Sequence, residues 1–268
     1  MSSGSGHIIR RVTGVLVVLG TLCAVSAAEA QSFKSFRDKI FGKPMEDGRS
    51  SQAVPKVAHF VSEDGESFVF DSSQSIPLLR FDGDDEIFAL TATAGTRGDI
   101  IYKNDMGQPV LKATRWGGMV LFSDGRPMGD PVAVKGRADT FQPNRMTPEA
   151  LWLHLAKSAY RASRAIEHKV LFNADADTPG DSTIALFADA ATVASDALIQ
   201  AGEQGDSRKA LEGLHEVRFI EGRPPSARLD NGVLVLKLDP SRGTWGGHVS
   251  SKRIVKVLSA SFSLAVGH

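Results

Sequence analysis

Short apolar runs separated by polar turns fill residues 56–141. Phe60 and Phe68 belong to two such runs, which flank Asp64 and Gly65, a dipeptide typical of a tight β-hairpin turn. Further apolar runs bounded by glycine, aspartate or asparagine lie at 76–81, 86–91, 99–103, 110–114 and 119–122. Short strands that recur at this spacing predict an antiparallel sandwich or barrel.

After residue 146 the apolar residues recur with the spacing of an α-helix. Thr147 supplies a capping hydroxyl, and Pro148 suits the first position of a helix, which we expect to end near Val170. An alanine-rich segment over 182–201 predicts a second helix that packs closely against the first. A polar loop over 173–181 is expected to join the two helices.

Strand patterns return after residue 215. The runs 228–229 and 233–238 flank Asn231-Gly232, the strongest hairpin signal in the chain. The segment 253–266 alternates apolar residues with serines, which predicts a half-buried final strand. The order of strands, helices and strands predicts an α+β fold: an antiparallel β-rich domain, sandwich-like or barrel-like, with a helical hairpin inserted before the last strands. We expect this single domain to cover residues 56–268.

Residues 1–30 have the pattern of a signal peptide. Arg10 and Arg11 precede a charge-free run over 12–25, and the small-x-small sequence that ends at Ala30 matches a cleavage site. As a helix the run would span only about 20 Å, less than the roughly 30 Å of a hydrocarbon core, which argues against a retained anchor. We therefore expect cleavage after Ala30 and a periplasmic or secreted protein.

Composition and charge narrow the function classes. The 268 residues include 31 basic and 31 acidic side chains, 42% hydrophobic and 23% charged residues, which is typical of a folded, soluble protein. This balance excludes a multi-span membrane protein and a strongly basic nucleic-acid binder, so no nucleic-acid partner is expected. Because the only cysteine, Cys23, lies in the expected signal peptide, the mature chain would have no disulfide and no thiolate metal site.

The segment 31–55 starts as a short basic amphipathic helix and continues as a polar linker. Phe33, Phe36 and Ile40 are spaced as one helical face, with basic residues between them. We favour docking of this face onto the core of the protein. The alternative is weak contact with a membrane surface, as a component of the cell envelope.

Charged clusters have structural interpretations. The acidic residues from Asp82 to Glu86 lack the spacing of metal ligands and are expected to form a solvated turn. A basic stripe on the first predicted helix, which includes Arg161, is expected to pair with Asp189, Asp196 and Glu203 of the second. The alternative is that the stripe binds anionic lipid or a cell-wall polymer.

Two Trp-Gly-Gly units are the first candidates for a ligand site. Glycines beside a tryptophan let a ligand approach the indole ring, and neighbouring donors add hydrogen bonds. The candidate ligand-binding residues are Arg115, Trp116, Trp245 and His248. The favoured alternative is that the glycines form turns or bulges and the indoles pack inward.

The chain resembles an exported bacterial family whose function is unassigned. The residues that carry the likeness lie at 97–105, at 115–119 and at Ser250-Ser251 before Arg253, and the likeness covers about 57–260. The resemblance implies export and a single domain, and it supplies no catalytic residues.

No catalytic motif is found, because the chain lacks the Gly-x-Ser-x-Gly, Ser-x-x-Lys, His-Glu-x-x-His and phosphate-loop patterns. We therefore assign no catalytic residue, metal ligand or cofactor. The leading hypothesis is an exported binding or envelope-associated module. The alternative is an envelope hydrolase that uses carboxylates or histidines assembled by the fold; two acids, or a His–Asp pair, with shifted pKa values in one cleft would favour it.

Overall fold

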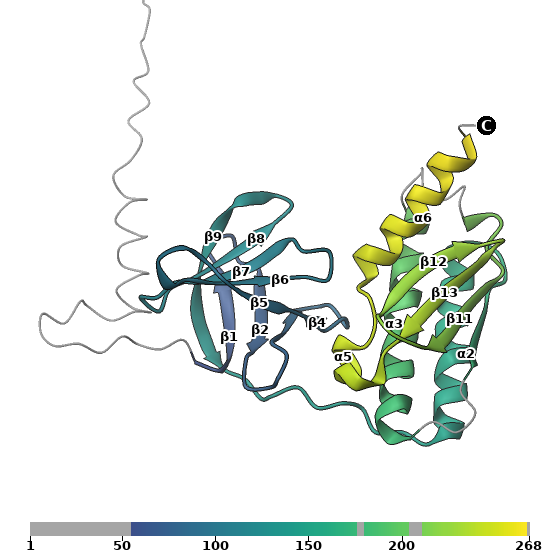
Figure 1. The fold of residues 1–268 in the computed structure, drawn as a ribbon, viewed down its shortest axis with the longest axis horizontal. Coiled ribbons are helices and arrows are strands. Elements are labelled where there is room, and N and C mark those ends of the chain that lie inside the picture. Colours follow the sequence, from purple (N-terminus) through teal and green to yellow (C-terminus); the bar gives the residue numbers. More distant parts are fainter. Residues whose placement is uncertain (1–54, 176–179, 204–210, 267–268) are drawn as a thin grey trace, which may run out of the picture. The chain divides into compact units, whose positions relative to one another are not determined.

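The computed structural model describes residues 55–175, 180–203 and 211–266 (Figure 1). The expected signal peptide and the segment with Phe33, Phe36 and Ile40 lie outside the described residues, so both remain predictions. The described chain has an α+β fold, with an antiparallel, nearly barrel-like sheet followed by helices and a second sheet. The predicted fold class is therefore confirmed.

Nine strands form the first sheet, in the order β4-β3-β2-β1-β9-β8-β7-β6-β5. The strands are β1 Val57–Ser62, β2 Ser67–Asp71, β3 Leu78–Phe81, β4 Phe88–Ala89, β5 Thr91–Ala94, β6 Ile100–Lys103, β7 Pro109–Ala113, β8 Met119–Ser123 and β9 Arg126–Arg137, with the short 3-10 helix η1 Thr96–Gly98 before β6. Every pairing is antiparallel, and the outermost strands, β4 and β5, are consecutive in the chain. Alternate side chains such as Phe60, Phe68 and Leu121 form the core of this sheet, as the period-two pattern predicts.

A second sheet of four strands pairs in the order β10-β11-β13-β12. The second part of the chain consists of α2 Pro148–Ala165, β10 Leu171–Asp175, α3 Asp181–Glu203, β11 Glu216–Glu221, β12 Ser226–Asp230, β13 Val233–Leu238, η2 Pro240–Arg242, α5 Gly243–Gly246 and α6 Ser251–Val266. The strands β10, β11 and β13 run parallel, and β12 joins β13 as an antiparallel hairpin. Asn231 and Gly232 have positive φ angles in that hairpin, as the sequence signal predicts.

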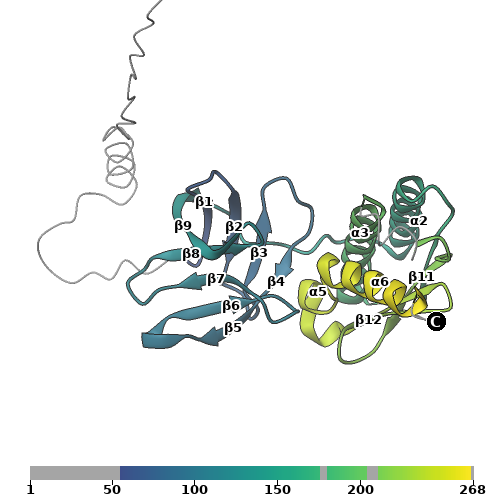
Figure 2. The same ribbon diagram turned by 90° about the horizontal axis from the view of Figure 1, so that it is seen from above.

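The helix α3 lies at the centre of the second core. It packs against both α2 and α6 (Figure 2) and shares a cluster with alternate strand residues such as Phe219 and Leu236. By length and composition α3 could cross a membrane, but 72% of its apolar window is buried inside the fold. Its small alanines therefore serve close helix packing, and the two predicted helices are confirmed in α2 and α3.

Two local predictions are wrong. The segment 253–266 is the helix α6 and not a strand, because Ile254 and Leu258, four residues apart, are both fully buried and Ser259 bonds back to the Val255 carbonyl. The expected polar loop contains the strand β10, which Asn173 and its neighbours form by parallel pairing with β11. Both outcomes depend on tertiary partners that local alternation does not reveal.

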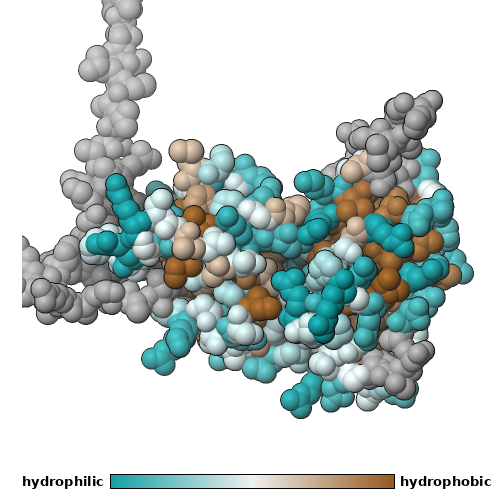
Figure 3. All heavy atoms as spheres, viewed as in Figure 1, coloured by the Kyte–Doolittle hydropathy of each residue, from teal (hydrophilic) through white to brown (hydrophobic). Residues whose placement is uncertain are grey.

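Buried groups connect the first sheet with the second part of the chain. Asp71, at the end of β2, accepts hydrogen bonds from Ser73, from Thr140 and from the Phe141 backbone at 3.2 Å. Phe141 in turn packs edge-on against Trp245 of α5, with ring centroids 6.3 Å apart. In Figure 3, hydrophobic areas of the visible surface gather around α6 and the adjacent strands, among largely hydrophilic neighbours.

Candidate functional site

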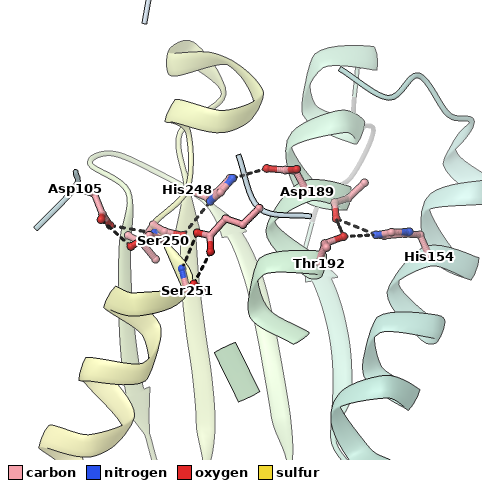
Figure 4. Close-up of polar contacts among 10 residues, drawn as sticks. Asp105, His154, Asp189, Thr192, His248, Ser250 and Ser251 are labelled. Atoms are coloured by element: carbon pink, nitrogen blue, oxygen red, sulfur yellow. Dashed lines mark hydrogen bonds and ion pairs between the residues drawn. The ribbon is translucent and has the colours of Figure 1, made fainter. Parts of the chain in front are cut away.

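Two carboxylates from loops of the first sheet hold the N-terminus of α6. Asp105, in the β6–β7 turn, accepts hydrogen bonds from the Ser250 backbone nitrogen at 3.0 Å and from its hydroxyl at 2.7 Å (Figure 4). Glu86, between β3 and β4, accepts from the Ser251 nitrogen at 2.9 Å and from the Ser251 hydroxyl. The first N–H groups of a helix lack partners within it and carry partial positive charge, so both carboxylates act as caps.

Glu86 is a buried acid, with only 7% of its surface exposed. Burial raises the pKa of Glu86, and the two hydrogen bonds from Ser251 oppose that shift without cancelling it. The acidic run from Asp82 to Glu86 is therefore not uniformly solvated, because its last member lies inside the fold. The Glu86 side chain borders both a large groove and a smaller cavity.

A His–Asp pair, with the histidine buried and the aspartate half-buried, lies next to these caps. The Nε2 atom of His248 is 2.7 Å from Oδ2 of Asp189 on α3, and Nδ1 is 2.9 Å from the Val249 carbonyl oxygen (Figure 4). Both ring nitrogens thus face acceptors, an arrangement that suits an imidazolium. Burial lowers the pKa of His248, but the hydrogen bond and charge of Asp189, together with the Val249 carbonyl and the charge of Glu86, outweigh it, and the net shift is upward.

The titratable groups of this network are already engaged with one another. A histidine that activates a serine needs one nitrogen directed at the hydroxyl, yet both nitrogens of His248 have other partners and the Ser251 hydroxyl bonds to Glu86. Further along, His154 of α2 bonds to the Ala188 carbonyl and to Thr192, each at 3.0 Å (Figure 4). Glu86 and His248, both with raised pKa values, are therefore close together, but the geometry of these groups is that of a structural network.

The groove beside Glu86 has a volume of about 1500 Å³. Its carboxylates are Glu66, Asp82, Asp84, Asp85, Glu86, Asp124, Asp196 and Glu203, and its cations are Arg161 and Lys252. Both cations already pair with acids: Arg161 lies 2.8 Å from Asp196, and Lys252 lies 3.2 Å from Asp124. The groove therefore presents a strong excess of negative charge.

Neighbouring negative charges help to raise the pKa values of two acids in the groove. Burial raises the pKa of Glu66, and the negative charges of Asp130 and Asp84 add to the shift. Burial also raises the pKa of Asp196, where repulsion from Asp85 and Asp84 acts against the stabilising Arg161. Burial and the neighbouring negative charges thus make ionisation of these two carboxylates less favourable than it is in water.

The smaller cavity, of about 300 Å³, lies next to the groove and shares Glu86, Phe88 and Asn104 with it. Trp245 and His248 contribute to its wall, together with residues of the β6–β7 turn and the start of α6. Within the described ranges, no three His, Asp or Glu side chains come together as a metal-binding group.

A family model described as a domain of unknown function, DUF4908, matches residues 35–258. The chain belongs to this family. The predicted resemblance to a family of unassigned function is thereby confirmed. No curated protein and no solved structure gave a match.

The four candidate ligand-binding residues lie in two separate places in the DUF4908 domain. Trp245 and His248 are buried and border the small cavity. Arg115 and Trp116 lie on the β7–β8 turn, where Trp116 is 75% exposed and the Arg115 guanidinium lies 4.1 Å from its ring centroid. The two Trp-Gly-Gly units therefore do not line the same cavity, and only one of the two tryptophans packs inward.

The expected pairing of charge stripes occurs in the DUF4908 domain between Arg161 and Asp196. Asp189 instead contacts His248, and His154 hydrogen-bonds to the Ala188 carbonyl and the Thr192 hydroxyl on α3. Sequence reasoning missed the roles of Glu86 and Asp189, since each depends on a partner at least 59 positions away. The Ser250-Ser251 pair was the available signal, because serines before an apolar run are a helix-start pattern.

Proposed function

We propose that this protein is an exported binding module of the periplasm, the cell envelope or the extracellular medium, and that its acidic groove binds a basic peptide segment of a partner. The observation that carries the proposal is the groove of about 1500 Å³, whose eight carboxylates outnumber its two cations. A groove of this size offers room for an extended segment. Charge complementarity then supplies steering and specificity.

The raised pKa values of two groove acids support a positively charged ligand in the groove. Glu66 and Asp196 have raised pKa values in part because neighbouring carboxylates repel their charge. A lysine or arginine placed between them would relieve that repulsion and favour the ionised forms. Apolar groove residues such as Phe81 and Phe122 add surface for the aliphatic part of such side chains.

Fluorescence anisotropy with labelled oligolysine and oligoglutamate peptides tests this proposal on the mature chain 31–268. Oligolysine should bind, and binding should weaken as salt rises, because the contacts are electrostatic. The double variant Asp84→Asn/Asp85→Asn should bind it about fivefold more weakly or worse. The matched control Asp139→Asn/Asp230→Asn changes two exposed acids outside the groove and should leave affinity unchanged. Equal binding of both peptides would contradict the proposal.

The raised pKa of Glu86 favours one alternative, an envelope hydrolase with Glu86 as proton donor. To deliver a proton to a leaving group at the border of the groove, Glu86 would have to exchange one of its hydrogen bonds from Ser251 for one to the substrate. Cleavage of cell-wall fragments by the wild type, lost in Glu86→Gln while the variant keeps its thermal stability, would support this alternative over simple binding.

Export itself is tested by mass spectrometry of the mature N-terminus after cell fractionation. We expect Gln31 as the first residue, in the soluble periplasm or the medium. An intact N-terminus in the membrane fraction would instead support a retained anchor.

A further inference from the structure

The small cavity differs from the groove because the carboxylates that line it are already hydrogen-bonded within the protein. Its acids, Glu86 and Asp105, are both occupied as caps of α6, each with two hydrogen bonds from a serine. Neither carboxylate therefore has its full charge available to a ligand. The charge and polarity of the cavity therefore depend on its other lining residues.

Three cations line the same cavity: Lys103 of β6, Arg242 of η2 and Arg253 of α6. In the part of the chain that the structure describes, Lys103 and Arg242 have no side chain within hydrogen-bonding or ion-pair distance. Arg253 donates from one nitrogen, Nη1, to the Asp105 carbonyl oxygen at 3.0 Å. Guanidinium and ammonium donors are thus available around a volume of about 300 Å³.

One part of the wall is apolar, beside polar lining residues such as Thr91, Asn104 and Ser250. Ile76, Ile87 and Leu90 line the cavity together with the indole of Trp245. Trp245 is held in place by its edge-on contact with Phe141, so the surface is preformed. A volume of about 300 Å³ lies at the lower end of the range for small-molecule sites, which combine apolar walls with a few polar groups.

We propose that this cavity binds a small carboxylate with an apolar body of a few carbon atoms. The carboxylate would accept hydrogen bonds from Arg242, Arg253 and Lys103, and the hydrocarbon would lie against Trp245 and the isoleucines. Acetate would lack the apolar body, and an amine of the same length would meet three cations. Carboxylate binding here does not depend on the basic partner of the groove, because it uses a different set of side chains.

Isothermal titration of the mature chain with hexanoate, hexylamine and acetate tests the proposal. Hexanoate should bind saturably and about tenfold more tightly than either hexylamine or acetate. The variants Lys103→Gln and Arg242→Gln should each weaken hexanoate binding several-fold. Their controls, Lys112→Gln and Arg228→Gln, change a lysine and an arginine that do not line the cavity and should bind like the wild type.

Absence of saturable hexanoate binding, equal affinity for hexylamine, or unchanged affinity in both cavity variants would overturn the proposal. Equal affinity for acetate would also overturn it, because the apolar wall would then play no part. Retained oligolysine binding in the Lys103→Gln and Arg242→Gln variants would separate this result from failure of the groove proposal.

Discussion

At the scale of single residues, the structure depends on buried charges that have specific partners. Asp71 and His248 are both buried, yet their hydrogen bonds shift their pKa values in opposite directions. Desolvation acts against the charged form at both sites, so the partners must supply the compensation. This makes the stability of the protein dependent on pH at two identifiable positions.

Asp71 should stabilise the protein most at neutral pH. Burial acts to raise its pKa, but hydrogen bonds from Ser73, Thr140 and Gln74 lower it to about 2, from an ordinary value of 3.8. Because the folded pKa is the lower one, the stabilisation is present above pH 4 and disappears as pH falls toward 2. We expect Asp71→Asn to cost about 2 kcal/mol at pH 7 and progressively less below pH 4. Urea denaturation across this pH range measures the difference; a constant difference would contradict the assignment.

His248 should show the opposite dependence. Its folded pKa is raised above 6.5, so its stabilisation is complete below that pH and is lost as pH rises through the folded value. In Asp189→Asn, burial would dominate, and the pKa of His248 should fall below 6.5 with a loss of about 2 kcal/mol in unfolding free energy. NMR titration of the imidazole carbons follows this directly, with the His168 signal as an internal reference. An unchanged His248 titration would show that Asp189 does not stabilise the protonated imidazole of His248.

At the scale of elements, α6 is the helix on which the site depends. Sequence alternation predicted a strand over 253–266, because serines fall at alternate positions there, but the same residues place Ile254 and Leu258 on one buried helical face. The decisive information is the pair of caps from Asp105 and Glu86, which are more than 140 positions away in the sequence. Strands with tight turns, and helices with clear caps such as Thr147, were predictable because their signals are local.

Removing a cap should destabilise the protein measurably. Asp105→Ala deletes the acceptor for two Ser250 donors, and we expect a loss of about 1–2 kcal/mol in unfolding free energy by urea denaturation. The matched control is Asp64→Ala, which breaks an exposed ion pair with Arg126 and should cost about 0.5 kcal/mol or less. Equal losses of unfolding free energy in the two variants would show that the Asp105 cap stabilises the protein no more than an exposed ion pair does.

At the scale of the whole molecule, the sequence predicted the α+β class and the helical centre but neither the cavities nor the charge that lines them. The groove brings together acids of the β3–β4 loop, such as Asp84, and of α3, such as Asp196, which lie more than 100 positions apart. Sequence reasoning treated the first set as a solvated turn and the second as partners of α2. Only their common position beside Glu86 shows that they line one groove, which we propose as the binding surface.

Hydrogen–deuterium exchange of residues 31–268, with and without saturating oligolysine, tests the proposed role of the groove most directly. We predict slower amide exchange at 82–86 and at 196–203, with the β12–β13 hairpin unchanged as an internal control. Protection confined to the outer face of α2, or no protection at all, would contradict the assignment of the groove as the binding site.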